Sequence, residues 1–532
     1  MANPPCSALQ GLAVRLRWGF FDASPGASIR DRRVAADWAA SNCLECSMRG
    51  TLGAPPPRIS TNAELLSSPL APPDFRKRAG RSGPPLLSTE RSTAPERRCD
   101  PLRTRRKFGI ATRLVVIRRV SFASEGQKVR RSNRVEPAFP RGAVQTFNMG
   151  RVPPVTFGAG RVAKLPDLVA GLGGGPVLIV ADAALKRFGV TDRLAEALTA
   201  RGIAHDVAAE VAGEPKETLV DDLCMRARDA GSRCVIGLGG GAAMDTAKLV
   251  AALARSPQPA RAFALASQPL PGNGLPSIAI PTTAGTGSEV TRTSIVSTPE
   301  GLKNWYWGED LMFAQAVLDP ELTVSLPAHL TAWTGIDAVA HAIEGATARA
   351  TNPAGLLYGL EALRLLAEFL PRAVAEGTDI EVRGRVLWAS MLAGLALHNC
   401  NTHMGHNISH ALGSLARVHH GLVTGLALEV SLPWLVARPE GAENYARVSQ
   451  ALGGAATAEA LPDAFADLMR ACRIPAQLPV ECTGVSDAAL AAEMKNAANL
   501  GMSQNAACTV TEADLDAAAT LMMRLPVAAA SA

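Results

Sequence analysis

The chain has 532 residues, a hydrophobic fraction of 47% and a formal net charge of +6. This length exceeds one ordinary domain and suffices for two large cores. The sequence contains no run of roughly 18 apolar residues, so we predict no membrane span. Arg15 and Arg17 interrupt the apolar residues near the start, so we expect no signal peptide. Ten cysteines without an export signal favour reduced thiols and a cytoplasmic location.

The positive charge is confined to the first part of the chain. Residues 1–148 hold 26 Lys and Arg against 11 Asp and Glu, whereas residues 149–532 hold 28 against 37. The first segment is rich in Arg, Pro and Ser, a composition that buries too little apolar surface to offset chain entropy. We predict a basic, disordered extension, or one that is not part of the natural protein, because Met149 directly precedes the first orderly pattern. Nucleic-acid or membrane binding by this segment is the alternative.

Short apolar runs alternate with helical patterns in the next part of the chain. The expected strands are 177–180, 234–238 and 278–280, and the expected helices include 193–201 and 242–254. This alternation predicts βαβ units and a mostly parallel sheet. Strand signals stop after about Pro327, and long Ala/Leu-rich helical patterns follow at 355–367, 382–398 and 456–472. The expected fold is an α/β domain at 149–329 followed by an all-helical domain at 330–532.

Two loops at strand ends carry the features of a phosphate site. Gly239, Gly240 and Gly241 lie between a strand and a helix, where glycines allow close backbone approach and the helix N-terminus attracts negative charge. Residues 281–289 follow the next strand and offer four hydroxyls with two glycines. Either loop alone is explained by turns and caps, but two loops in one sheet favour a nucleotide.

Asp182 ends an apolar strand and is a candidate for selecting the nucleotide. Its carboxylate could accept hydrogen bonds from a ribose 2′-OH and would repel a 2′-phosphate, which favours NAD over NADP. An Asp at this place is also a frequent helix N-cap, so both interpretations remain open.

Histidines cluster in the helical half. Six of the nine lie between residues 398 and 420, and Asp337 and His341 are four residues apart upstream. Residues at i and i+4 share a helix face, so Asp337/His341 and His406/His410 form two pairs, and His420 follows after a short loop. A carboxylate with several imidazoles predicts a site for a divalent transition metal such as Fe or Zn.

Residues 155–525 resemble the iron-containing (group III) alcohol dehydrogenase family, which shares the dehydroquinate synthase-like fold. The resemblance is carried by four motifs, which are 239–248, 281–289, 334–345 and His406-x3-His410-x9-His420-Gly421. It implies a Rossmann-like parallel-sheet nucleotide domain followed by an all-helical metal-binding domain. The implied activity is hydride transfer between a primary or secondary alcohol, or its aldehyde or ketone, and NAD.

The resemblance also implies roles for single residues. The metal, Fe²⁺ or Zn²⁺, would be held by Asp337, His341, His406 and His420. His410 would lie near the nicotinamide and substrate, where it could relay a proton. The implied cofactor-binding residues, with NADP less favoured than NAD, are Asp182, Gly239, Gly240, Gly241, Ala242, Asp245, Thr282, Thr283, Thr286, Ser288 and Lys303.

Several features depart from the family pattern or leave other functions open. Ala242 stands where Ser is usual, and residues 304–308 are unusually aromatic.

A maleylacetate reductase of the same fold is an alternative, although such enzymes often have Asn where this chain has Asp337. A nucleic-acid-binding protein and a metal-binding module without turnover are others. For the enzyme we expect an alcohol or aldehyde substrate, no membrane or nucleic-acid partner, and a homodimer or larger homo-oligomer.

Overall fold

The computed structural model describes residues 146–529. The predictions for residues 1–145, which comprise disorder, a non-natural extension and nucleic-acid or membrane binding, lie outside the described residues.

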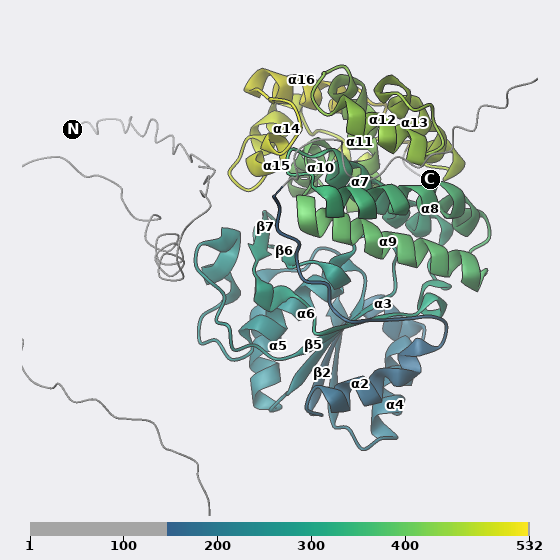
Figure 1. Ribbon diagram of the computed structural model, residues 1–532. Helices are drawn as coiled ribbons and strands as arrows, with labels where there is room; N and C mark the ends of the chain where they lie inside the picture. The colour runs from purple at the N-terminus through teal and green to yellow at the C-terminus, as the bar shows by residue number, and fades with distance from the viewer. Residues whose placement is uncertain (1–145, 530–532) are drawn as a thin grey trace, which may run out of the picture. The chain divides into compact units, whose positions relative to one another are not determined.

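A six-stranded parallel sheet forms the centre of the first half (Figure 1). The strand order is β1-β8-β5-β4-β2-β3. The strands are β1 (Val155–Phe157), β2 (Val177–Asp182), β3 (His205–Val211), β4 (Cys234–Gly239), β5 (Ser277–Pro281) and β8 (Gln315–Leu318). From β2 the chain moves to β3 on one side, and β4 continues to β5 on the other, so the direction of winding reverses between β2 and β4. Ligands of open α/β sheets bind outside the carboxyl ends of strands at such a reversal.

Helices cover both faces of this sheet, as Figure 1 shows. They are α2 (Leu165–Gly171), α3 (Ala183–Arg187), α4 (Val190–Thr199), α5 (Glu217–Asp229) and α6 (Gly241–Leu253). Val177 and Ile179 of β2 belong to the core that includes α2 and α4, whereas Leu178 and Val180 belong to the core that includes α5 and α6. Because side chains alternate along a strand, a strand buried on both faces must be apolar throughout. This explains the continuous apolar runs in the sequence.

An antiparallel hairpin, absent from our sequence prediction, lies apart from this sheet. It pairs β6 (Thr293–Ser297) with β7 (Lys303–Trp307). The buried Tyr306 donates a hydrogen bond from its hydroxyl to Glu217 over 2.9 Å. The unusual aromatic run is therefore half of a hairpin anchored to α5.

The second half is helical throughout its named elements. These are α7 (Ala328–Thr347), α8 (Pro353–Ala375), α9 (Ile380–Cys400), α10 (Met404–Leu415), α11 (His420–Val436), α12 (Ala442–Ala451), α13 (Leu461–Ala471), α14 (Asp487–Met494), α15 (Leu500–Gln504) and α16 (Glu512–Met523). The change from strands to helices falls between β8 and α7, and the exact division into domains at 329/330 stays a prediction. Among the described residues, no helix is long and apolar enough to span a membrane.

Helix α7 is the central helix of this half. All residues from Thr334 to Thr347 are buried, and α7 packs against α8, α9 and α11. A helix enclosed on all sides needs apolar or small residues around its circumference, so a polar side chain in it requires a specific partner. Asp337, His341 and Glu344 are such side chains, one turn apart along the helix.

The residues before β1 connect the two halves. The backbone amide of Gly150 donates to the side-chain oxygen of Asn399, near the end of α9, over 3.0 Å. A Cβ on Gly150 would lie 2.0 Å from Nε2 of His398, so a larger residue here would force the imidazole ring to move. His398 thus packs against the segment that leads into the sheet.

Candidate metal centre and nucleotide site

The two glycine-containing loops meet at the carboxyl ends of β4 and β5. A Cβ on Gly240 would lie 3.5 Å from the Thr283 side chain, and one on Gly241 would lie 2.7 Å from Cγ2 of Thr286. Helix α6 begins at Gly241, so its N-terminal amides and the positive end of its dipole face this junction. The sequence predicted each loop separately, and the structure brings them together in one place.

A hydrogen bond between the side chains of Asp245 and Ser288 links the two loops. The Ser288 hydroxyl donates to Oδ1 of Asp245 over 2.5 Å, and Oδ2 of Asp245 accepts from the backbone amide of Ile295 over 2.8 Å. Lys248 Nζ lies 3.6 Å from Oδ1 and donates to Thr291 over 3.0 Å and to the Thr293 carbonyl over 2.7 Å. These bonds make Asp245 and Ser288 supports of the loop, and their direct contact with a cofactor stays a prediction.

Asp182 occupies the end of β2, beside the glycine loop. Its Oδ1 accepts a hydrogen bond from the amide of Ala184 over 2.8 Å, which caps α3. A Cβ on Gly239 would lie 3.1 Å from Cβ of Asp182. The cap interpretation is therefore present in the structure, and the carboxylate also stands next to the candidate phosphate loop at the reversal between β2 and β4.

Lys303 reaches from the hairpin toward the helical half. Its Nζ lies 3.1 Å from a carboxylate oxygen of Glu214. A Cβ on Gly413 of α10 would lie 3.1 Å from the Cε atom of Lys303, so the lysine lies against the helix that carries His406 and His410. Lys303 thus connects the hairpin to the helix that carries two of the predicted site histidines.

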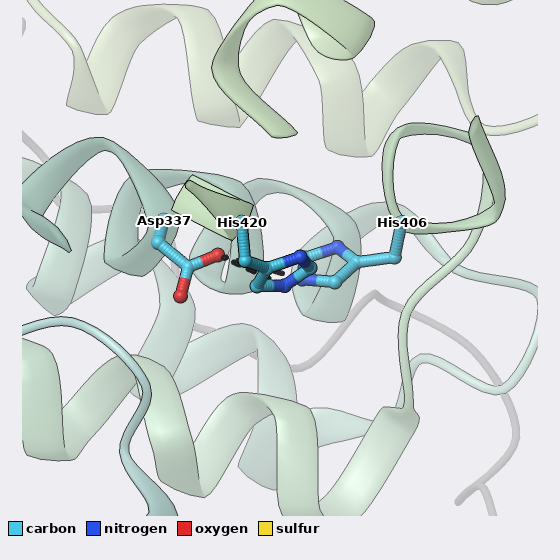
Figure 2. A group of neighbouring side chains, drawn as sticks. All are labelled: Asp337, His406 and His420. Carbon is cyan, nitrogen blue, oxygen red and sulfur yellow. Dashed lines mark ion pairs between the residues drawn. The ribbon is translucent and has the colours of Figure 1, made fainter. Parts of the chain in front are cut away.

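Three of the four predicted metal ligands converge (Figure 2). Oδ1 of Asp337 lies 3.7 Å from Nε2 of His406 and 3.6 Å from Nε2 of His420. Ligands at about 2.1 Å from a tetrahedral ion are about 3.4 Å apart, so these separations fit an ion of that kind. Asp337 comes from α7 and His406 from α10. His420 follows the short loop after α10, as expected, and is the first residue of α11.

His341 lies outside this group of three ligand atoms. Its ring stacks on that of His406, with centroids 4.6 Å apart and planes inclined by 24°. Its Nδ1 is buried and has no hydrogen-bond partner. His341 is thus adjacent to the centre, and its role as the fourth ligand stays a prediction.

Unpartnered buried polar atoms lie at this centre. Asp337 Oδ1 and His406 Nε2 are both buried without a hydrogen-bond partner. Such atoms carry a desolvation cost of several kcal/mol in total unless something compensates them. One carboxylate oxygen and two imidazole nitrogens that face a common point supply that compensation to a divalent cation, so the residues fit a metal ion.

Glu344 is a functional residue that the sequence analysis missed. Its carboxylate, which is fully buried, accepts from His406 Nδ1 over 2.5 Å and from the backbone amide of Gly405 over 2.6 Å. Burial opposes its charge, but His403 and His406 outweigh that effect and lower the pKa of Glu344 to about 2. An ionised outer carboxylate fixes His406 with Nε2 free for a metal. The sequence signal that could have revealed Glu344 is an acidic residue three positions after His341 in an otherwise apolar helix.

The remaining histidines divide into two groups. The ring of His410 lies with its centroid 5.1 Å from that of His420 and 6.2 Å from that of His406, so it borders the centre. Burial and the nearby Lys303 hold the pKa of His410 well below its usual range. His419 packs on Trp333, and His403 is fully buried against Glu344.

Comparisons with known proteins agree with this geometry. The sequence profile described as "Iron-containing alcohol dehydrogenase" matches residues 153–320, and "Fe-containing alcohol dehydrogenase family, C-terminal" matches residues 331–517. The probable alcohol dehydrogenase EutG of Escherichia coli (strain K12) is 35% identical over 319 residues, which are 58% of this chain and 80% of that protein. The NAD-dependent methanol dehydrogenase of Bacillus methanolicus is 31% identical over 60% of this chain and 84% of that protein.

A solved structure shows the same architecture. The sulfoacetaldehyde reductase of Bifidobacterium kashiwanohense, in complex with NAD⁺, superposes with a TM-score of 0.65 and 27% identity, over 72% of this chain and 100% of that chain. The profiles span both halves of the described fold, and the relatives are matched over most of their length. This chain therefore belongs to the iron-containing alcohol dehydrogenase family.

Proposed function

We propose that this enzyme transfers hydride between a primary or secondary alcohol, or its aldehyde or ketone, and NAD, beside a metal held by Asp337, His341, His406 and His420. The observation that carries the proposal is the convergence of unpartnered ligand atoms next to the nucleotide loops. A Cβ on Gly285 would lie 2.5 Å from the carbonyl of Thr334, three residues before Asp337. A nucleotide on those loops would therefore extend toward the metal ligands.

The bound metal would act as a Lewis acid on the substrate oxygen and favour its anionic form. The protein supplies the alignment of the two reactants. Glu344 holds His406, and the N-terminus of α6 attracts the cofactor pyrophosphate. His410 borders the same point without belonging to the group of ligand atoms, and we assign it to the nicotinamide and substrate, where it can hand a proton outward.

NAD is proposed over NADP because of Asp182. Asp182 lies beside Gly239, and its Oδ1 caps α3. We assign its second oxygen to a ribose hydroxyl, and its charge would repel a 2′-phosphate. Among the metals, we propose Fe²⁺, with Zn²⁺ as the substitute that the same nitrogen and oxygen ligands accept.

We also propose a cytoplasmic location and a homo-oligomeric assembly. The six described cysteines are all free and buried, which supports a reducing cytoplasm. The family resemblance implies a homodimer or larger homo-oligomer, which sedimentation velocity on the purified enzyme would measure. Asp337 and its two facing imidazoles support an alcohol dehydrogenase over a maleylacetate reductase.

Metal analysis of the His406→Ala variant tests the metal site. The wild type should hold one divalent ion per chain after reconstitution with Fe²⁺ or Zn²⁺. The variant should lose most of that metal and its NAD-linked activity toward a panel of small alcohols and aldehydes. Stoichiometric metal in the variant would contradict the assignment, and a wild type that oxidises no alcohol and reduces no aldehyde would contradict the reaction.

A further inference from the structure

A buried polar chain extends from the metal centre to the far end of α7. Its first member, Glu344, is bonded to His406 and to the amide of Gly405, the second residue of α10. The carboxylate therefore ties α7 to the N-terminus of α10, where the helix dipole favours negative charge. A second imidazole completes its surroundings, because Nδ1 of His403 lies 3.2 Å from the oxygen that Gly405 contacts.

His403 is held in turn by Thr347. The hydroxyl of Thr347 lies 3.0 Å from His403 Nε2, and both side chains are buried. Burial lowers the pKa of His403 despite the attraction of Glu344, so the ring carries one proton. The carboxylate can only accept, which assigns that proton to Nδ1 and leaves Nε2 able to accept from the hydroxyl. The single hydrogen of the Thr347 hydroxyl has a second acceptor, the Ile343 carbonyl, at 2.8 Å. Nδ1 of His403 lies at ion-pair distance from Glu344 without a hydrogen bond, so the contact between them is electrostatic.

We infer that His403 is a positioning residue that acts through Glu344 to set the orientation of His406 and thereby the metal affinity of the centre. Without a neighbour on that side, Glu344 could turn away from His406, because one oxygen serves the Gly405 amide and the other serves the ring. An imidazole whose outer nitrogen lacks a fixed acceptor loses both orientation and basicity as a ligand. The inference rests on the proposed metal site and adds a residue that does not itself touch the metal.

The test compares three variants at position 403 in the full chain, with Co²⁺ as the probe. His403→Leu removes the contact to Glu344. His403→Asn places an amide donor near the former Nδ1, and His403→Gln places one near the former Nε2.

Competition with a chelator measures Co²⁺ affinity, and the visible absorption of the bound ion reports the ligand geometry. Loss of outer partners typically weakens metal binding about 10- to 100-fold. We expect a loss of about tenfold for Leu and Gln, with a shifted spectrum, and recovery with Asn.

Two controls separate orientation from general damage. His398→Leu removes another buried histidine, which packs on Gly150 and is not part of the chain of bonds, and should leave Co²⁺ affinity unchanged. Thr347→Val keeps the side-chain shape and removes only the hydroxyl. It should weaken binding less than His403→Leu, and it tests the inference if the Leu variant fails to fold.

Each outcome has a distinct meaning. Wild-type Co²⁺ affinity in His403→Leu, or equal losses in the Leu and Asn variants, would overturn the positioning role. If His403→Leu does not fold, unchanged affinity in Thr347→Val would overturn it instead. Failure of the wild type to bind Co²⁺, or full binding by His406→Ala, would contradict the proposed metal site itself.

Discussion

The His406 imidazole lies between two carboxylates, and it is hydrogen-bonded to only one of them. Glu344 accepts its Nδ1 hydrogen over 2.5 Å, whereas Oδ1 of Asp337 stands 3.7 Å from Nε2, too far for a hydrogen bond. The bonded carboxylate fixes the ring, and the open gap on the other side suits an ion of ordinary ligand distance. His406 therefore contacts its supporting carboxylate through Nδ1 and faces the metal centre through Nε2.

Asp182 combines two roles that substitutions can separate. Asn is as good an N-cap as Asp but lacks the charge, whereas Gly lacks both the charge and the side-chain acceptor. Asp182→Asn should raise activity with NADP relative to NAD at an unchanged melting temperature. Asp182→Gly should raise the same ratio and lower stability by a few tenths of a kcal/mol. Steady-state rates with both nucleotides provide the ratio. A wild type that already prefers NADP would reduce Asp182 to a cap.

His410 should affect turnover without affecting metal content. Its ring borders those of His406 and His420, but it lies outside the group of converging ligand atoms. His410→Phe preserves a flat ring and removes both nitrogens. We expect stoichiometric metal and a fall in kcat of about 100-fold, the lower end of what a positioned proton-transfer group contributes. Loss of metal in this variant would show that the ligand set is misassigned.

Sequence spacing identified residues that share a helix face but not their partners on other helices. Asp337/His341 and His406/His410 follow from the helical period, and both pairs lie on helices. Glu344 remained hidden because its partner His406 is 62 residues away, and their bond depends on how α7 and α10 cross. For the same reason the sequence could not foresee that His403 points to Glu344.

At the scale of elements, glycines allow the hydroxyl-rich loop after β5 to pack against the helical half. Gly287 has a φ of +61°, and a Cβ there would lie 2.4 Å from Cα of Gly394 in α9. A backbone atom cannot move aside as a flexible side chain can. The loop and α9 therefore approach each other through two facing glycines, and this contact couples the nucleotide loop to the metal-binding helices.

Gly287→Ala should therefore cost more than backbone strain alone. Gly272 has a φ of +72° with no atom within 4 Å of the added Cβ, so Gly272→Ala measures the strain by itself. We expect about 1 kcal/mol of destabilisation for Gly272→Ala. For Gly287→Ala we expect about 3 kcal/mol and a higher KM for NAD, because overpacking adds to the strain. Urea unfolding and NAD titration provide the two readouts. Equal losses in the two variants would show that the loop yields without cost.

The sequence predicted elements well where one pattern dominates a segment. The apolar runs at β2, β4 and β5 are confirmed, and the helical patterns at 355–367, 382–398 and 456–472 correspond to α8, α9 and, from Leu461 on, α13. The hairpin of β6 and β7 was missed because its aromatic run packs through one residue, Tyr306, whose partner Glu217 lies 89 residues earlier. Short edge strands such as β1, with three residues, carry too little periodicity to be recognised.

At the scale of the whole molecule, the segment before β1 links the α/β half to the helical half (Figure 1). The linkage depends on the bond from Gly150 to Asn399 and on the cover that Gly150 gives to His398. Burial lowers the pKa of His398 to about 4, so the packed ring is neutral near pH 7. Gly150 thus contributes to the contact between the two halves of the described fold.

Two truncated variants define where the functional protein begins. A chain that starts at Met149 keeps Gly150 and should retain the melting temperature and activity of the full chain, because residues 1–148 are predicted to contribute no core. A chain that starts at Pro154 loses the bond to Asn399 and exposes His398. Its free energy of unfolding should be lower by about 2 kcal/mol, the scale of one hydrogen bond plus an uncovered polar group.

Thermal and urea unfolding of the two chains measure the difference. A loss of stability or activity on starting at Met149 would show that the basic segment packs on the enzyme. Equal stability of the two chains would show that the Gly150 contact contributes nothing to the union of the two halves.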